Sequence, residues 1–218
     1  MKRVVAVDGP SGSGKSTVSR GVADALGLSV LDTGAMYRAV TLAALDAGID
    51  PADADAAAAT ARRSRIDLDD GRVQLDGRDV TSQIRGPAVT DAVSIVSAHP
   101  RVREVLVGRQ REWVERHGGG VVEGRDIGTV VFPDAPVKVY LTASDDERAR
   151  RRQRDERAAD RDVDVESVRK ALGRRDQLDA SRATSPLRRA DDALVIDTTG
   201  RDADDVVAEI VARYEALS

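Results

Sequence analysis

The chain has 218 residues, of which 41% are hydrophobic and 33% are charged, and its formal net charge is −4. These values are typical of a globular protein, and no apolar stretch approaches the roughly 20 residues of a membrane span. The acidic balance argues against nucleic-acid binding through overall charge, and the lack of Cys excludes disulfides and thiolate metal sites. Because a strand-like run starts almost at the first residue, no signal peptide is expected and a cytoplasmic location is predicted.

Short apolar runs alternate with helix-length segments along the chain. The runs predict buried strands at Val4–Val7, Leu28–Leu31, Val121–Val122, Val137–Leu141 and Leu194–Ile196. Helices are predicted over residues 15–27, 36–47, 100–117, 145–158, 164–176 and 203–217, and an exposed helix within the Ala/Asp-rich stretch Pro51–Ala61. Parallel strands joined by right-handed helical crossovers follow from this alternation. The predicted fold class is therefore α/β, a doubly wound five-stranded parallel sheet with helices on both faces.

The first predicted strand ends in a glycine-rich segment, Gly9 to Thr17, which reads G-P-S-G-S-G-K-S-T. The pattern G-x-x-x-x-G-K-[ST] after a strand turns backbone N–H groups around phosphates, and the following helix adds its positive end. Lys15 is predicted to reach the β- and γ-phosphates, Ser16 to hold Mg²⁺ directly and Thr17 to lie near the α-phosphate. The predicted triphosphate-binding residues are Gly9, Pro10, Ser11, Gly12, Ser13, Gly14, Lys15, Ser16 and Thr17.

Two stretches interrupt the alternation. Asp67–Arg85 carries turn signals at Asp70-Gly71 and Asp76-Gly77 between alternating apolar and polar residues, and predicts a small antiparallel sheet. Glu147–Arg161 is an Arg-dense helical segment with two open interpretations. One is a solvated helix with i,i+4 ion pairs, and the other is a mobile lid whose Arg side chains close over a transferring phosphate.

A kinase for a small acceptor needs a second anion site lined by Arg. The segment L-D-T-G-A-M-Y-R, residues 31–38, begins at the end of the second predicted strand, and E-G-R-D-I-G-T, residues 123–129, at the end of the third. Open α/β sheets bind ligands at these strand ends. Arg38 and Arg125 are therefore predicted to converge near the glycine-rich loop.

Several motifs resemble those of bacterial cytidylate kinases, the CMP kinase branch of the nucleoside monophosphate kinases. They are D-G-P-S-G-S-G-K-S-T, L-D-T-G-A-M-Y-R, P-R-V-R, E-G-R-D-I-G-T-V-V-F-P-D-A-P-V-K and S-R-A-T-S-P-L. They occur in the family's order and nearly span the chain, and the block Glu123–Lys138 is specific to this family. The resemblance implies a Mg²⁺-dependent enzyme that transfers the γ-phosphate of ATP to CMP or dCMP, giving CDP or dCDP and ADP.

The resemblance also implies a P-loop NTPase-type core with two functional segments. Residues 1–35 would form core with the P-loop, 36–98 the NMP-binding segment with its small β insert and 99–145 further core. Residues 146–162 would form the Arg-rich lid and 163–218 the C-terminal part of the core, in one folded unit overall. The implied partners are ATP and CMP or dCMP, with no nucleic acid and no membrane, and a monomer is expected.

Carried over by motif, the acceptor site falls on residues throughout the chain. Arg38 and Arg125 resemble clamps on the CMP phosphate, where a bidentate guanidinium would fix the oxygen for in-line attack. Asp126 belongs to the group that resembles a cytosine reader. Because a carboxylate only accepts hydrogen bonds, it favours the cytosine amino group over the uracil carbonyl. The predicted CMP-binding residues are Thr33, Arg38, Ser94, Arg103, Arg125, Asp126, Arg175, Asp179 and Arg182.

Three of these residues resemble family positions that contact ribose and phosphates. The spacing of Arg175, Asp179 and Arg182 predicts one helical face, and ordinary i,i+4 Arg–Asp pairing stays open as the alternative. The predicted catalytic residues are Lys15, Arg125 and Arg175. The candidate lid residues for contact with the phosphates are Arg148, Arg151, Arg152 and Arg154, and the sequence does not single out one of them.

Glu123 stands where relatives commonly carry Asp, at a strand end that would hold Mg²⁺ through water. The departure keeps the charge and lengthens the side chain. His99 and His117 are predicted to have structural roles, and Trp113 to pack in the core.

Other functions compete with this prediction. A kinase for UMP, dTMP or shikimate is the competitor among enzymes, and a P-loop ATP-dependent module that binds nucleic acid through the Arg-rich helix comes from another class. A regulatory GTPase would need an Asn-Lys-x-Asp motif to bind guanine. The chain contains no Asn, which argues against this function.

Overall fold

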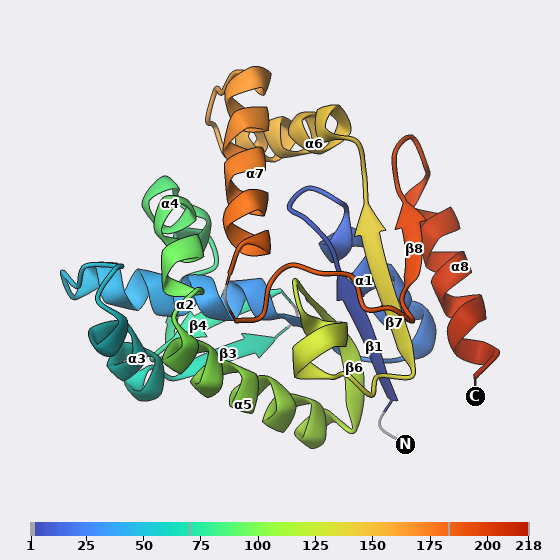
Figure 1. Ribbon diagram of the computed structural model, residues 1–218, viewed down its shortest axis with the longest axis horizontal. Helices are drawn as coiled ribbons and strands as arrows, with labels where there is room; N and C mark the ends of the chain where they lie inside the picture. The colour runs from blue at the N-terminus through green and yellow to red at the C-terminus, as the bar shows by residue number, and fades with distance from the viewer. Residues whose placement is uncertain (1–2, 70, 183, 218) are drawn as a thin grey trace. The chain divides into compact units, whose positions relative to one another are not determined.

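The computed structural model describes residues 3–69, 71–182 and 184–217, and the chain divides into two compact units (Figure 1). Met1–Val30 and Gly118–Ser218 form one, here called the P-loop unit. Leu31–His117 form the other, here called the inserted unit. No helix among the described residues is long and apolar enough to cross a membrane.

The P-loop unit is built on a five-stranded sheet with the strand order β2-β6-β1-β7-β8. Its strands are β1 (Arg3–Asp8), β2 (Val30–Asp32, at the boundary between the units), β6 (Gly119–Gly124), β7 (Val137–Thr142) and β8 (Leu194–Asp197). β1 pairs in parallel with β6 and β7, and β7 pairs in parallel with β8. Each predicted strand is present, and the predicted α/β fold class is confirmed.

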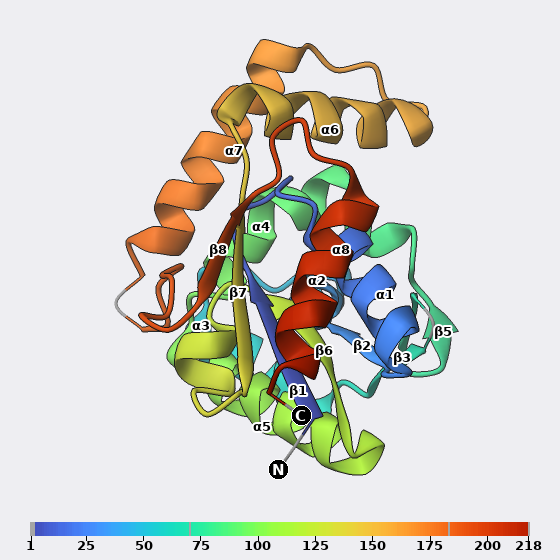
Figure 2. The same ribbon diagram turned by 90° about the vertical axis from the view of Figure 1, so that its right-hand side faces the viewer.

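The central strand is apolar because both of its faces are covered. Val4 to Val7 of β1 are at most 2% exposed, which explains the uninterrupted apolar run in the sequence. Helices α1 (Lys15–Leu26) and α8 (Ala203–Glu215) pack side by side over this core, where Val18, Val22 and Ile210 are buried (Figure 2). Full burial of each such side chain contributes roughly 1.5–3 kcal/mol.

Two helices of the P-loop unit follow β7 and pack on each other (Figure 2). They are α6 (Asp145–Ala158) and α7 (Val165–Ala180). The Ser144 side chain caps α6 by accepting a hydrogen bond from the Glu147 N–H. α7 runs to Ala180, beyond the predicted end at residue 176.

The inserted unit contains the predicted small antiparallel sheet, made of β3 (Ile66–Asp69), β4 (Arg72–Leu75) and β5 (Arg78–Asp79). The Asp76-Gly77 turn has φ of 52° and 82°, the positive values that a tight two-residue hairpin needs. Asp70, part of the other predicted turn, lies outside the described residues. The sheet ends at Asp79, and Gln83–Arg85 forms the short 3₁₀ helix η1 instead of a strand.

Helices make up the rest of the inserted unit: α2 (Thr33–Asp46), α3 (Ala54–Arg63), α4 (Pro87–Val96) and α5 (Pro100–His117). α2 begins at Thr33, before the predicted residue 36, because the Asp32 carboxylate caps it by accepting from the Ala35 N–H. α4 was not predicted. α3 confirms the helix expected within Pro51–Ala61, but the expectation that this helix is exposed was wrong, since α3 buries Ala57, Ala58 and Ala61.

The histidines and Trp113 have the structural surroundings that the sequence predicts. His99 Nε2 lies 2.8 Å from the Pro51 carbonyl oxygen, and His117 Nδ1 lies 2.8 Å from that of Trp113. Trp113 is 7% exposed and stacks on the His117 ring. These contacts hold α5 and its neighbouring segments in place.

Candidate active site

The glycine-rich loop joins β1 to the N-terminus of α1. Gly12 and Gly14 have φ of 78° and 89°, which side-chain-bearing residues rarely adopt. A Cβ on Gly9 would lie 2.2 Å from the Leu141 carbonyl oxygen, so only glycine fits there. The loop therefore presents backbone N–H groups at a helix N-terminus, where an anion is favoured.

Lys15 lies buried beneath this loop. Its Nζ donates to the carbonyl oxygens of Gly9, at 2.9 Å, and Pro10, at 2.7 Å. Burial lowers the pKa of Lys15 to about 7, and the neighbouring Arg125 and Arg175 guanidiniums add to this effect while Glu123 and Asp8 oppose it. A bound phosphate would favour the charged ammonium, so the site is electrostatically suited to an anion.

Ser16 and Glu123 meet at the first turn of α1 and the end of β6. The Ser16 hydroxyl donates to Glu123 Oε2 at 3.0 Å, and Glu123 is 4% exposed. A hydroxyl beside a carboxylate is an oxygen donor set that fits Mg²⁺. No group of three or more His, Cys, Asp or Glu residues that could hold a metal is found in the described part of the chain. Mg²⁺ commonly takes one or two protein ligands together with substrate phosphates and water, and this pair fits that habit.

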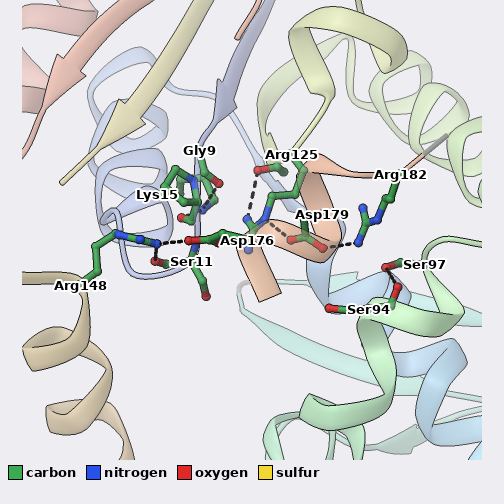
Figure 3. A network of polar contacts seen from close by, with 12 residues as sticks. Gly9, Ser11, Lys15, Ser94, Ser97, Arg125, Arg148, Asp176, Asp179 and Arg182 are labelled. Carbon is green, nitrogen blue, oxygen red and sulfur yellow. Dashed lines mark hydrogen bonds and ion pairs between the residues drawn. The ribbon is translucent and has the colours of Figure 1, made fainter. Parts of the chain in front are cut away.

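Three predicted CMP-binding residues meet in what we call the Arg–Asp cluster: Arg125, Asp179 and Arg182 (Figure 3). Arg125 Nε donates to Asp179 Oδ2 at 3.0 Å, and Arg182 donates to Asp179 Oδ1. The Asp179 side chain is only 2% exposed. The predicted single helical face was wrong for Arg182, because α7 ends at Ala180. Asp179 and Arg182 do form a local ion pair, at i,i+3 spacing rather than the i,i+4 spacing of the alternative.

Arg175, on the same helix, lies partly buried beside this cluster. Burial and the nearby Arg125 guanidinium lower the pKa of Arg175 to about 10. Its Nε has no hydrogen-bond partner among the described residues. An N–H donor that is shielded from water and has no partner is costly, and an anionic ligand would supply the missing partner.

α6 has the i,i+4 ion pairs of one interpretation of the Arg-dense segment, and it also contacts the glycine-rich loop. Arg151 and Arg152 pair with Glu147 and Glu156 at i,i+4 spacing. Arg148 instead reaches the glycine-rich loop, where it donates to the Ser11 carbonyl oxygen at 3.1 Å and to the Asp176 carboxylate (Figure 3).

Arg151 also contacts the loop, through an intermediate residue. It donates to Thr198 Oγ1 at 2.9 Å, and that hydroxyl donates to the Ser13 carbonyl oxygen at 3.1 Å. Of the four candidate lid arginines, Arg148 and Arg151 are therefore the two whose contacts lead to the glycine-rich loop.

The remaining predicted residues belong to the inserted unit. Arg38 Nη1 donates to the Ile84 carbonyl oxygen at 2.9 Å and to Thr90 Oγ1 at 3.0 Å. The Arg103 guanidinium lies 5.3 Å from the centre of the Tyr37 ring, a cation–π contact.

The nine predicted CMP-binding residues thus fall into two sets, one in each unit. Thr33 opens α2, Ser94 lies on α4 and both are buried, so the inserted unit holds Thr33, Arg38, Ser94 and Arg103. The P-loop unit holds Arg125, Asp126, Arg175, Asp179 and Arg182.

A model of the cytidylate kinase family matches residues 5–216. The chain belongs to the cytidylate kinase family. A cytidylate kinase of Mycobacterium avium strain 104 is 58% identical over 200 residues, which cover 90% of this chain and 88% of the relative. A cytidylate kinase of Desulforamulus reducens strain MI-1 is 50% identical over 216 residues, which cover 98% and 97%.

Among solved structures, a gluconokinase from Sinorhizobium meliloti 1021 is similar with a TM-score of 0.51 at 16% identity, covering 99% of this chain and 93% of that one. At this identity the likeness concerns the fold alone.

Two acidic residues that contact the site in this cytidylate kinase family member were not among the predicted site residues. Asp176 accepts a hydrogen bond from Arg148, 28 positions away, and one from the Ser11 N–H at 3.4 Å. Asp8 accepts from backbone N–H groups near Asp126. No local spacing rule connects such distant positions, although the place of Asp8 directly before the glycine-rich loop was a usable signal.

Proposed function

We propose that this chain is a Mg²⁺-dependent cytidylate kinase that transfers the γ-phosphate of ATP to CMP or dCMP. An oxygen of the acceptor phosphate bonds to the γ-phosphorus while the bond from that phosphorus to the β,γ-bridging oxygen breaks, giving CDP or dCDP and ADP. The observation that carries the proposal is the Arg–Asp cluster in the same unit as a complete phosphate-binding loop, in a chain of this family.

The donor half of the proposal assigns ATP to the glycine-rich loop. The backbone N–H groups of Gly9 and residues 11–14 and the ammonium of Lys15 bind the phosphates, as loops of this form do. Ser16 would hold Mg²⁺ directly and Glu123 through water, and the ion when bound neutralises charge on the β- and γ-phosphates. No covalent intermediate is needed, because transfer of this kind depends on positioning and charge stabilisation.

The acceptor half assigns the CMP phosphate to arginines. Arg38 and Arg125 clamp its oxygens, and Arg175, with its unsatisfied Nε, donates to the phosphate that moves. The Asp126 carboxylate, with Thr33, Ser94 and Arg103, reads the base. Asp179 and Arg182 contact the ribose and phosphates.

Closure of α6 is proposed to exclude water from the transferring phosphate. Arg148 and Arg151 already engage the loop backbone directly or through Thr198. Water exclusion would suppress ATP hydrolysis in favour of transfer.

A coupled ADP-release assay with ATP, Mg²⁺ and a panel of acceptors tests the proposal. CMP and dCMP are expected to react well above UMP, dTMP and shikimate. Equal rates for all acceptors, or none above background ATP hydrolysis, would overturn it. A cytoplasmic location and a monomeric state stay predictions, and size-exclusion chromatography with light scattering tests the second.

A further inference from the structure

Asp8 caps a turn that lies 119 residues further along the chain. It is the last residue of β1 and is 4% exposed. Its Oδ1 accepts a hydrogen bond from the Ile127 N–H and its Oδ2 one from the Gly128 N–H, each at 2.8 Å. These two residues begin η2, the π-helical turn Ile127–Val131. Asp8 therefore satisfies N–H groups that a helix start leaves without partners inside the helix.

The residue in position to cap this turn itself is Asp126. It occupies the N-cap position, and its backbone carbonyl accepts from the N–H groups of Val130, at 2.9 Å, and Val131, at 3.2 Å. Asp is among the preferred N-cap residues, because its side-chain oxygen accepts from an early N–H of the helix. The Asp126 carboxylate nevertheless makes no capping bond. A second carboxylate, from β1, performs that role.

We propose that Asp8 is a positioning residue for base recognition, which caps the turn in place of Asp126 and so directs the Asp126 carboxylate toward the base. This inference rests on the proposed function, because it concerns the choice between CMP and UMP. Asp8 itself contacts no substrate in this scheme and acts through Asp126.

The charges around Asp8 are consistent with a carboxylate that accepts both bonds. Burial raises the pKa of Asp8 to about 6, as does the nearby Asp126 carboxylate, while the two N–H donors and the Lys15 ammonium oppose the rise. At pH 7.5 the group is therefore ionised. Asparagine in its place would offer one oxygen and turn an NH₂ group toward the second N–H, so one of the two capping bonds would be lost.

The test compares steady-state kinetics of the unmodified protein and Asp8→Asn with CMP and with UMP at pH 7.5. The KM for CMP is expected to rise, and the ratio of kcat/KM for CMP over UMP to fall about tenfold, as expected for weakening one buried hydrogen bond. The KM for ATP is expected to stay unchanged. Equal losses for both acceptors in a folded variant would overturn the inference, since a structural defect would produce that result.

Asp202→Asn is the matched control. Asp202 also caps a helix of the P-loop unit, accepting from the Asp204 N–H at 2.9 Å at the start of α8. Its substitution removes a capping carboxylate far along the chain from Asp126, and the acceptor ratio is expected to stay unchanged.

A double-mutant cycle separates positioning from general damage. In an Asp126→Ala background, Asp8→Asn is expected to change the acceptor ratio no further, whereas an additional tenfold loss would overturn the inference. If Asp8→Asn does not fold, Asp8→Glu probes the same contact, because the longer side chain keeps both carboxylate oxygens but shifts them relative to the Ile127 and Gly128 N–H groups. A smaller fall in the ratio is expected there, and an unchanged ratio counts against the inference. An unmodified protein without any preference for CMP would instead overturn the proposed function and the inference with it.

Discussion

The glycine-rich loop and the Arg–Asp cluster lie in one unit but are built in different ways. The loop consists of consecutive residues whose backbone geometry only glycine permits at Gly9, Gly12 and Gly14. The cluster joins Arg125 to Asp179, 54 residues apart, through the end of β6 and helix α7. Local backbone rules determine the first, and the packing of distant elements determines the second. One part of a site can therefore be predicted from a local sequence motif, while another part depends on how distant elements pack in the fold.

Substitution of the loop lysine should have the largest effect. Lys15→Ala is expected to lower kcat for CMP by on the order of 10³-fold while the far-ultraviolet circular dichroism stays native, because it removes a cation aimed at the transferring phosphate. Lys170→Ala, on the exposed face of α7 where Lys170 pairs with Glu166, is the control and should retain full activity. Normal turnover by Lys15→Ala would remove the loop from the reaction.

Substitution within the cluster should affect stability as well as turnover. Asp179→Ala leaves Arg125 and Arg182 without their shared buried carboxylate, and is expected to lower the free energy of unfolding by about 3–5 kcal/mol. Urea denaturation measures this loss. The comparison variant Asp164→Ala removes an exposed cap of α7 and should cost about 1 kcal/mol. Equal losses for the two variants would mean that the cluster is not a buried charge network.

Asp8 connects the loop strand to the Asp126 turn, and its titration tests that connection. Its pKa is raised from 3.8 to about 6 in the folded protein, so between these values the folded state binds more protons than the unfolded state. Stability contributed by Asp8 is therefore greatest at low pH and falls as the pH rises to 6, by about 3 kcal/mol. The stability difference between the unmodified protein and Asp8→Asn should follow this fall and be flat above pH 7. A difference independent of pH would contradict the burial of an ionised carboxylate here.

The smallest effect is expected at the base reader, where selectivity changes more than rate. Asp126→Asn should lower the preference for CMP over UMP by roughly ten- to a hundredfold, because asparagine can also turn an NH₂ donor toward the uracil carbonyl, whereas a carboxylate only accepts. The ratio of kcat/KM values in the coupled assay measures it. An unchanged ratio would leave Asp126 without a role in recognising the base.

The fold was predictable wherever a local pattern matched a tertiary requirement. Val4–Val7 reads as a strand because both faces of β1 are buried, and α1 ends where the Gly27 backbone turns left-handed. α4 was missed, since its start at Gly86-Pro87 resembles a loop and its polar cap is absent. The burial of α3 was missed because Ala is compatible with either solvent or close packing, and only its neighbours decide.

The residues of the candidate site likewise differ in whether a local sequence pattern predicts them. Gly9 to Thr17 could be located from spacing alone and Arg125 from its place at a strand end, whereas Asp179 and Arg182 were located through the resemblance to a family. Asp176 had neither signal, because its partner Arg148 lies on another helix. The departure of Arg182 from the helical face has a similar cause: the spacing rule assumes a helix that in fact ends at Ala180.

Trp113 gives this molecule an intrinsic optical reporter. It is the one tryptophan of the sequence, is 7% exposed and stacks on His117 with 4.0 Å between ring centroids. Tryptophan emission therefore comes from the inserted unit alone, and its red shift on exposure to water follows the unfolding of Leu31–His117. Circular dichroism follows the helices of both units. Coincident transitions would mean that the two units unfold cooperatively, and separated transitions would give each unit a stability of its own.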